Sequence, residues 1–373
     1  MRADRTTFGG LLRTFACGAT LMIGTGSTAL AADSISVVTS IKPVHSLVAS
    51  VMSGVGTPSL IVEGAGSPHT YALKPSQAQA LEKADVVFWI GHEIETFLEK
   101  PVETLGKKAR VVELMDTEGL VKLKLREGGA FEAHAHDDHD DHDDHAEKTK
   151  AAKDHDDHDH GHDHDDHADA KHDDHDDHAK TKKTKAGQDD HGHDDHAHGS
   201  GEDAHIWLDP ANAKVMVSKI AATLAAADAR NAAAYKANAK ALTARLDALV
   251  ANVQATVKPV QGRGFIVFHD AYHYFEDRFG LEAAGAISVN PEVLPGASRV
   301  AEIKAKVNKL GATCVFAEPQ FEPKLVNVVT EGTKAKKGVL DPLGASIENG
   351  PDLYFTLIEN LGRSFSDCLS SAS

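Results

Sequence analysis

Three features that the sequence lacks each argue against a class of protein. None of its 3 cysteines forms a Cys-x-x-Cys pair, which disfavours a thiolate zinc site. There is no His-Glu-x-x-His element of the kind that binds zinc in many metalloproteases. There is also no run of about 20 consecutive apolar residues, the length that a membrane-spanning helix needs. Arg13 interrupts the most apolar segment, Phe8 to Leu30, so a membrane anchor is disfavoured too.

The N-terminus instead has the pattern of an export signal. Arg2, Arg5 and Arg13 make the start basic, the segment up to Leu30 is mostly apolar and small, and Ala29-Leu30-Ala31 fits a cleavage site. We therefore expect residues 1–32 to be a signal peptide, cleaved near Ala31/Ala32, and the mature protein to reside in the periplasm.

The negative charge of the chain is confined to one segment. The formal net charge is −17, and residues 132–203 alone hold 26 acidic residues and 8 lysines, a charge of −18. The rest of the chain is therefore nearly neutral. Nothing in this distribution suggests a nucleic-acid partner.

That acidic segment is a histidine–aspartate tract, with repeats such as His139-Asp-Asp-His142-Asp-Asp-His145. Imidazole is a common ligand of Zn, Cu and Ni, and interleaved carboxylates attract cations. With almost no apolar residues, the tract cannot offset the entropy of ordering it, so we predict a disordered, metal-attracting loop. The alternative is a solvated acidic spacer with incidental histidines. The 18 candidate secondary ligands are His134, His136, His139, His142, His145, His155, His158, His160, His162, His164, His167, His172, His175, His178, His191, His193, His196 and His198.

Outside the tract, strand and helix patterns alternate, as is typical of parallel α/β sheets. Short apolar or β-branched runs predict strands at 35–40, 59–63, 85–91, 109–114, 264–269, 281–288, 313–317 and 338–340. Helices are predicted at 43–52, 93–100, 210–228, 231–257, 271–279, 297–310, 323–330 and 352–369, and residues 74–77 are predicted to begin one more helix.

The segment 231–257 is unusually long for a helix and contains no glycine or proline, which favours a linking role. We predict an α/β fold of two (βα)-repeat lobes with parallel sheets, joined by this helix, with a metal cleft between the lobes. The N-terminal lobe spans 33–229 and includes the tract, the linking helix spans 230–258, and the C-terminal lobe spans 259–373.

Cys314 and Cys368 are the cysteines that remain after cleavage. One lies on a predicted strand and the other near the C-terminus, so in an oxidising compartment we predict a disulfide between them. A metal site made of two thiolates is the rival interpretation.

Four candidate metal ligands lie just after a predicted strand or before a predicted helix: His69, His205, His269 and Asp341. In open α/β sheets, ligands bind beyond the carboxyl ends of the strands. Three imidazoles with a carboxylate or water match a tetrahedral zinc site. Each residue also has a structural interpretation, such as a turn at Asp341-Pro342.

Three other histidines are weaker candidates. His45 lies in a predicted first helical turn and is expected to cap the helix or face solvent. His92 ends a predicted strand and is a candidate accessory ligand, and His273 is expected to line the cleft or the lobe surface.

Six segments resemble the ZnuA-type zinc-binding proteins, in the family's order. This family belongs to the cluster-9 (A-I) solute receptors that serve ABC transporters. The segments are Gly66-Ser-Pro-His-Thr-Tyr-Ala-Leu-Lys-Pro-Ser76, His205-Ile-Trp-Leu-Asp-Pro210, Phe265-Ile-Val-Phe-His-Asp-Ala-Tyr272, Val289-Asn-Pro-Glu292, Cys314-Val-Phe-Ala-Glu-Pro-Gln320 and Leu340-Asp-Pro-Leu-Gly344.

The resemblance implies a periplasmic receptor that binds Zn²⁺ between two lobes through His69, His205 and His269, and a Cys314–Cys368 disulfide. Some zinc-binding members have glutamate directly before the first histidine, where this chain has Pro68, so Asp341 or water is the fourth ligand. The manganese branch places a carboxylate at the third position, where this chain has His269.

The expected function is high-affinity Zn²⁺ capture and delivery to the membrane permease of a zinc ABC transporter, by a monomer that is not an enzyme. A periplasmic metallochaperone is a possible second partner. The alternatives are a zinc buffer without transporter delivery and a zinc-dependent hydrolase, since three ligands with an open position also suit catalysis.

Overall fold

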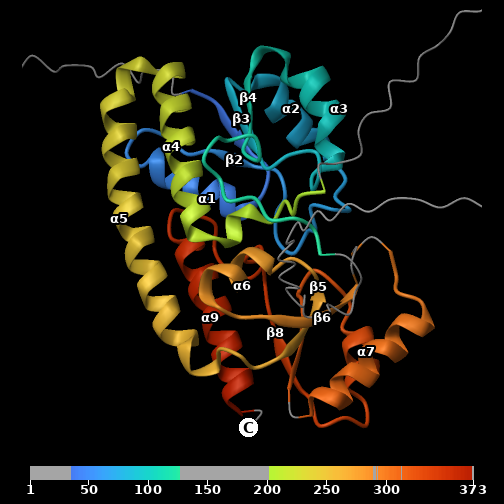
Figure 1. Ribbon diagram of the computed structural model, residues 1–373. Coiled ribbons are helices and arrows are strands. Elements are labelled where there is room, and N and C mark those ends of the chain that lie inside the picture. The colour runs from blue at the N-terminus through green and yellow to red at the C-terminus, as the bar shows by residue number, and fades with distance from the viewer. Residues whose placement is uncertain (1–34, 127–200, 289–290, 292, 312, 372–373) are drawn as a thin grey trace, which may run out of the picture. The chain divides into compact units, whose positions relative to one another are not determined.

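The computed structural model describes residues 35–126, 201–288, 291, 293–311 and 313–371 (Figure 1). The predicted signal peptide and all 18 histidines of the tract lie outside the described residues, so what the sequence indicates about them stays a prediction.

The first sheet has four parallel strands in the order β2-β1-β3-β4. Its strands are β1 (Val37–Thr39), β2 (Ser59–Leu60), β3 (Val86–Trp89) and β4 (Arg110–Glu113). Its helices are α1 (Lys42–Val51), α2 (Pro75–Lys83) and α3 (Thr96–Leu105). All four residues of β3 are buried, as expected for a central strand of a parallel sheet covered on both faces.

The second sheet repeats this topology in the order β6-β5-β7-β8, again with parallel pairs. Its strands are β5 (Phe265–His269), β6 (Ala283–Ser288), β7 (Cys314–Ala317) and β8 (Lys336–Val339). Its helices are α6 (His273–Phe279), α7 (Ala297–Leu310), α8 (Lys324–Thr330) and α9 (Leu353–Ser371). The predicted α/β class with two parallel-sheet lobes is confirmed.

The helix predicted at 93–100 differs most from its prediction. The sequence predicts a helix over 93–100, but α3 begins at Thr96 and continues past Pro101 to Leu105. The Glu95 carboxylate accepts hydrogen bonds from the backbone N–H groups of Ile90 (2.7 Å) and Gly91 (3.2 Å). These bonds fold residues 91–95 back onto the end of β3, so the helix starts later.

Two long helices connect the sheets in sequence, α4 (Pro210–Ala227) and α5 (Ala232–Val257). Figure 1 shows α5 running beside α4, and it also packs against α1 of the first lobe and α9 of the second. These contacts agree with the expected linking role of α5. The residue boundaries of the three predicted regions stay a prediction.

The two sheets share one hydrophobic core, which includes Val38 and Val87 of the first sheet and Phe265 and Val267 of the second. Alternate residues of β5 point the other way, because side chains along a strand alternate between the two faces of its sheet. Ile266 and Phe268 accordingly belong to a smaller core beneath α7 and α8. Both faces of the second sheet are therefore covered. The carboxyl ends of its strands remain as the place where its side chains can bind a ligand.

The predicted disulfide is confirmed between Cys314, the first residue of β7, and Cys368 in α9. It ties the last helix to the second sheet across 54 residues of sequence. Because both sulfurs are bonded to each other, the rival interpretation of a thiolate metal site at these cysteines is wrong.

Candidate metal centre

Three histidines from distant parts of the chain converge at one point. One nitrogen of each of His69, His205 and His269 lies within 4.8 Å of the nitrogens of the other two. The ring centroids are 5.4 to 5.8 Å apart, and the Nε2 atoms of His205 and His269 are 3.4 Å apart. The structure thus brings together the three imidazoles that the sequence indicates as ligands.

His269 is oriented by a carboxylate on the neighbouring strand. It is the last residue of β5, and Glu318 follows the end of β7, which pairs with β5. The His269 Nδ1–H donates to Glu318 Oε1 at 2.7 Å, which leaves Nε2 facing His205. Burial lowers the pKa of His269, but the buried Glu318 carboxylate, together with Asp270 and Asp203, more than offsets this, so the pKa is raised overall.

His205 is oriented in the same way, by a carboxylate two residues earlier. Asp203 Oδ1 accepts hydrogen bonds from Nδ1 of His205 at 2.7 Å and from its backbone N–H at 3.0 Å. The next turn is fixed at Trp207, whose indole N–H donates to the Pro342 carbonyl and whose own carbonyl accepts from the Tyr354 hydroxyl. Two of the three imidazoles therefore have the carboxylate partner that commonly supports a metal-binding histidine.

His69 lies in the loop between β2 and α2, which is held by a small hydrogen-bond network. The Tyr71 hydroxyl donates to the Ile61 carbonyl at 3.1 Å, and the Gln77 amide donates to both groups. Burial, together with the nearby His205 and His269, lowers the pKa of His69 to about 2. His69 therefore presents a neutral nitrogen, the form that binds metal.

The histidines border a cavity of about 10 Å³. Ile94 of the first lobe and Phe321 and Leu343 of the second add apolar walls. A cavity of about 10–15 Å³ holds one water molecule, whereas pockets for organic ligands measure about 300–1,000 Å³. The space suits a single ion and is too small for an organic substrate.

Asp341, the fourth predicted ligand, is not part of this group. Its Oδ1 accepts hydrogen bonds from the side-chain amide of Gln320 and from the backbone N–H groups of Leu343 and Gly344. Its Oδ2 accepts from the backbone N–H of Ala345 at 2.6 Å. The carboxylate therefore holds the turn that follows β8.

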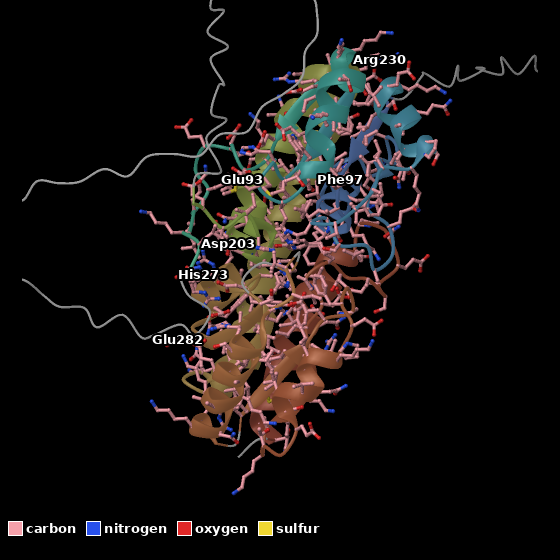
Figure 2. The ribbon with its side chains drawn as sticks, turned by 90° about the vertical axis from the view of Figure 1, so that its right-hand side faces the viewer. Glu93, Phe97, Asp203, Arg230, His273 and Glu282 are labelled. Carbon is pink, nitrogen blue, oxygen red and sulfur yellow. A yellow bond between two sulfur atoms is a disulfide. The ribbon has the colours of Figure 1, made fainter. Side chains whose placement is uncertain are left out.

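The other singled-out histidines have separate environments. His45 is buried, with Nε2 hydrogen-bonded to the Pro58 carbonyl at 3.1 Å, so the expectation that it caps a helix or faces solvent is wrong. His273, which is labelled in Figure 2, begins α6, and its side chain is partly buried. His92 lies between Glu93 and Glu113, outside the three-histidine group.

Sequence reasoning missed the orienting roles of Asp203 and Glu318. Asp203 carried a local signal, because it is a carboxylate only two residues before His205. Glu318 carried a weaker one, a carboxylate directly after an apolar strand. Recognising its role requires knowing that β5 and β7 are neighbours, which chain order does not reveal.

Comparison with known proteins identifies the family. The family model described as ZnuA, zinc-uptake complex component A, periplasmic, matches residues 37–368. The chain belongs to the ZnuA family. A relative from Brucella suis, the high-affinity zinc uptake system protein ZnuA, is 51% identical over 349 residues, which cover 94% of this chain and 96% of the relative. The protein of the same description from Yersinia pestis is 35% identical, covering 90% and 92%.

Solved structures share the fold at low sequence identity. A crystal structure of ZnuA is similar with a TM-score of 0.64 and 20% identity, covering 90% of this chain and 100% of that one. The periplasmic zinc-binding protein TroA from Treponema pallidum is similar with a TM-score of 0.65 and 16% identity, covering 89% and 98%. These likenesses establish the two-lobe architecture.

Membership of the ZnuA family confirms the resemblance seen in the sequence. The family supplies the periplasmic component of zinc uptake and is not a family of enzymes, so the expectation of a non-enzymatic protein is confirmed on that ground. Within the described part of the chain, no helix combines the length and apolar character needed to cross a membrane.

Proposed function

We propose that the mature chain captures Zn²⁺ in the periplasm at His69, His205 and His269 and delivers it to the membrane permease of a zinc ABC transporter. The observation that carries this proposal is the convergence of three imidazoles on an ion-sized cavity. Three imidazole nitrogen donors suit Zn²⁺, a borderline-soft cation that favours four ligands. The high-affinity zinc uptake function of the Brucella suis and Yersinia pestis relatives supports it.

Water is proposed as the fourth ligand rather than Asp341. Moving the Asp341 carboxylate toward the histidines would break its four hydrogen bonds. Each such bond contributes about 0.5–1.5 kcal/mol of stability. A water molecule can serve as the fourth ligand without breaking any of the hydrogen bonds of Asp341.

The tract is proposed to gather Zn²⁺ at many weak, exchangeable sites and to pass it to the tight site. Its last histidine, His198, lies only seven residues before His205. The described residues on either side of the tract are neighbours, since the Asp203 N–H donates to the Leu123 carbonyl and the backbones of Lys124 and Glu202 pair in an isolated antiparallel β-bridge. Asp203, which lies five residues after the last histidine of the tract in the sequence, also orients His205.

The remaining parts of the proposal concern processing and partners. The signal peptide would be cleaved near Ala31/Ala32, and the mature receptor would act as a monomer with the permease as its main partner. A periplasmic metallochaperone could supply zinc to it.

Two alternative functions, a zinc-dependent hydrolase and a zinc buffer, differ from the proposed one in what they require. A zinc-dependent hydrolase needs room for its substrate, which the cavity of about 10 Å³ does not offer. A zinc buffer would bind metal without supporting uptake.

Zinc uptake by living cells tests the proposal. The host should lack its own zinc receptor but retain the permease, and it should grow in chelator-limited medium. The chain should restore growth and zinc accumulation, and the combined His69→Ala, His205→Ala and His269→Ala variant should not. Purified chain that binds zinc tightly but never restores uptake would establish the buffer alternative.

A further inference from the structure

A second group of metal-ligand side chains lies on the first lobe. His92, Glu93 and Glu113 each offer one atom within 4.8 Å of the atoms offered by the other two. Glu113 ends β4, and His92 and Glu93 follow the end of β3, which pairs with β4. Glu93 is labelled in Figure 2. The group therefore lies at the carboxyl ends of two adjacent parallel strands, where α/β folds bind ligands.

The imidazole of His92 lies between the two carboxylates. Its Nδ1 is 3.1 Å from Glu113 Oε1, and its Nε2 is 3.5 Å from Glu93 Oε1. A side chain at Gly91 would prevent this arrangement. A Cβ atom there would lie 2.5 Å from Glu113 Oε1 and 2.8 Å from Glu93 Oε2, so both carboxylates converge over the bare backbone of Gly91.

The negative charge of this group is poorly compensated. Glu93 Oε2 is buried and has no hydrogen-bond partner among the described residues. Across the same described part of the chain, His92 is the one basic side chain that forms an ion pair with Glu93 or Glu113. Burial, and then the nearby Asp116, raise the pKa of Glu113 even though His92 opposes the shift. A bound cation would relieve both the burial cost and the repulsion.

We propose that His92, Glu93 and Glu113 bind a second divalent transition-metal cation, of the class that includes Zn²⁺ and Mn²⁺. One imidazole and two carboxylates are a donor set that these ions accept, and water would complete the coordination. The His92 side chain is 48% exposed, so this ion exchanges with solvent more readily than one at the three-histidine centre. The same short loop continues to Ile94, which lines the cavity of that centre.

Anomalous diffraction from crystals of the full mature chain locates the ion directly. Crystals grown with one equivalent of zinc and then soaked in excess zinc should show a first peak at the three histidines and a second between His92 and Glu113. The second peak should be absent in crystals of Glu113→Gln. A map that shows no second peak at saturating zinc overturns the proposal.

Thermal unfolding tests the same site in solution. With the tight site already saturated, a further rise in zinc concentration should raise the Tm, because an ion that binds only the folded state stabilises it. His92→Ala and Glu93→Gln should each lose this further rise, and Glu103→Gln, an exposed carboxylate of α3, should keep it. The tract is present in every variant, so its metal binding cancels in the comparison.

These measurements also separate a metal site from a simple ion pair. If His92 only pairs with the two carboxylates, His92→Ala shifts the Tm without added zinc and leaves the zinc-dependent rise intact. That result, or an equal rise in all variants, contradicts the proposal.

Discussion

The Nδ1–H of His269 donates to Glu318 Oε1 over 2.7 Å, between two groups that are almost fully buried. The bond fixes the imidazole so that Nε2 faces the other histidines, and the negative charge makes that nitrogen a stronger donor to a metal. Asp203 does the same for His205 at the same distance. The centre is thus organised by two carboxylates that need not touch the metal.

Neutralising either carboxylate should weaken zinc binding. Glu318→Gln and Asp203→Asn preserve the size of the side chain but remove its charge, and loss of such a partner costs about 10–100-fold in metal affinity. Chelator competition measures the change. Glu322→Gln, which alters an exposed carboxylate nearby, is the control and should leave the affinity unchanged. Equal affinities for all three variants would show that the partners do not tune the metal.

Zinc affinity should fall as the pH is lowered from 7 to 5. Because Glu318 raises the pKa of His269, His269 holds a proton over more of this range, and zinc must displace it. His69, with a pKa lowered to about 2, remains neutral throughout and releases no proton.

Titration calorimetry in buffers of different ionisation enthalpy counts the protons released by this centre. Fewer than three protons should leave per zinc ion bound there. An affinity that does not change with pH, or the release of three protons, would contradict this account of the three histidines.

Glu95 should make the folded chain less stable as the pH rises. It is completely buried, and burial raises its pKa from 4.5 to about 7. Between these values the folded state holds a proton that the unfolded state has lost. The free energy of unfolding therefore decreases with rising pH, by up to about 1.4 kcal/mol per pH unit.

The Glu95→Gln variant isolates this effect. Urea unfolding at several pH values between 4.5 and 7 should show that the variant lacks the part of the pH dependence due to Glu95. Parallel stability profiles for the two proteins would mean that Glu95 has the same pKa folded and unfolded.

Much of the fold could be predicted because the strands are short apolar runs between helical patterns. His69 and His269 lie beyond or at the ends of strands, which parallel sheets present at one edge, and the family resemblance indicated all three histidines as ligands. Asp341 shares that sequence context, but backbone N–H groups of its own turn use its carboxylate. Sequence position alone does not distinguish a ligand from a turn residue.

Relationships between strands were harder to predict. Glu318 supports His269 because β7 lies beside β5, and Glu113 reaches His92 because β4 lies beside β3. The order of strands in a sheet depends on packing between distant segments, which chain order does not specify. The sequence therefore indicates His92 as a candidate accessory ligand but does not indicate Glu93 and Glu113 as its partners.

Removal of the disulfide should destabilise the second lobe without abolishing zinc binding. A combined Cys314→Ser and Cys368→Ser variant should lose about 2–5 kcal/mol of unfolding free energy, as is typical for a native disulfide. Denaturant unfolding measures the loss. Zinc affinity should change less than tenfold, since neither cysteine lines the metal cavity. A large loss of affinity in the folded variant would show that α9 helps to position the ligands.

Zinc titration by chelator competition, on mature protein lacking residues 132–200, tests the central claim most directly. We expect one tight site to survive this deletion. It should disappear when His69→Ala, His205→Ala and His269→Ala are combined in the same background. Loss of tight binding on deletion alone would instead show that the tract is the high-affinity binder and that the three-histidine centre is not.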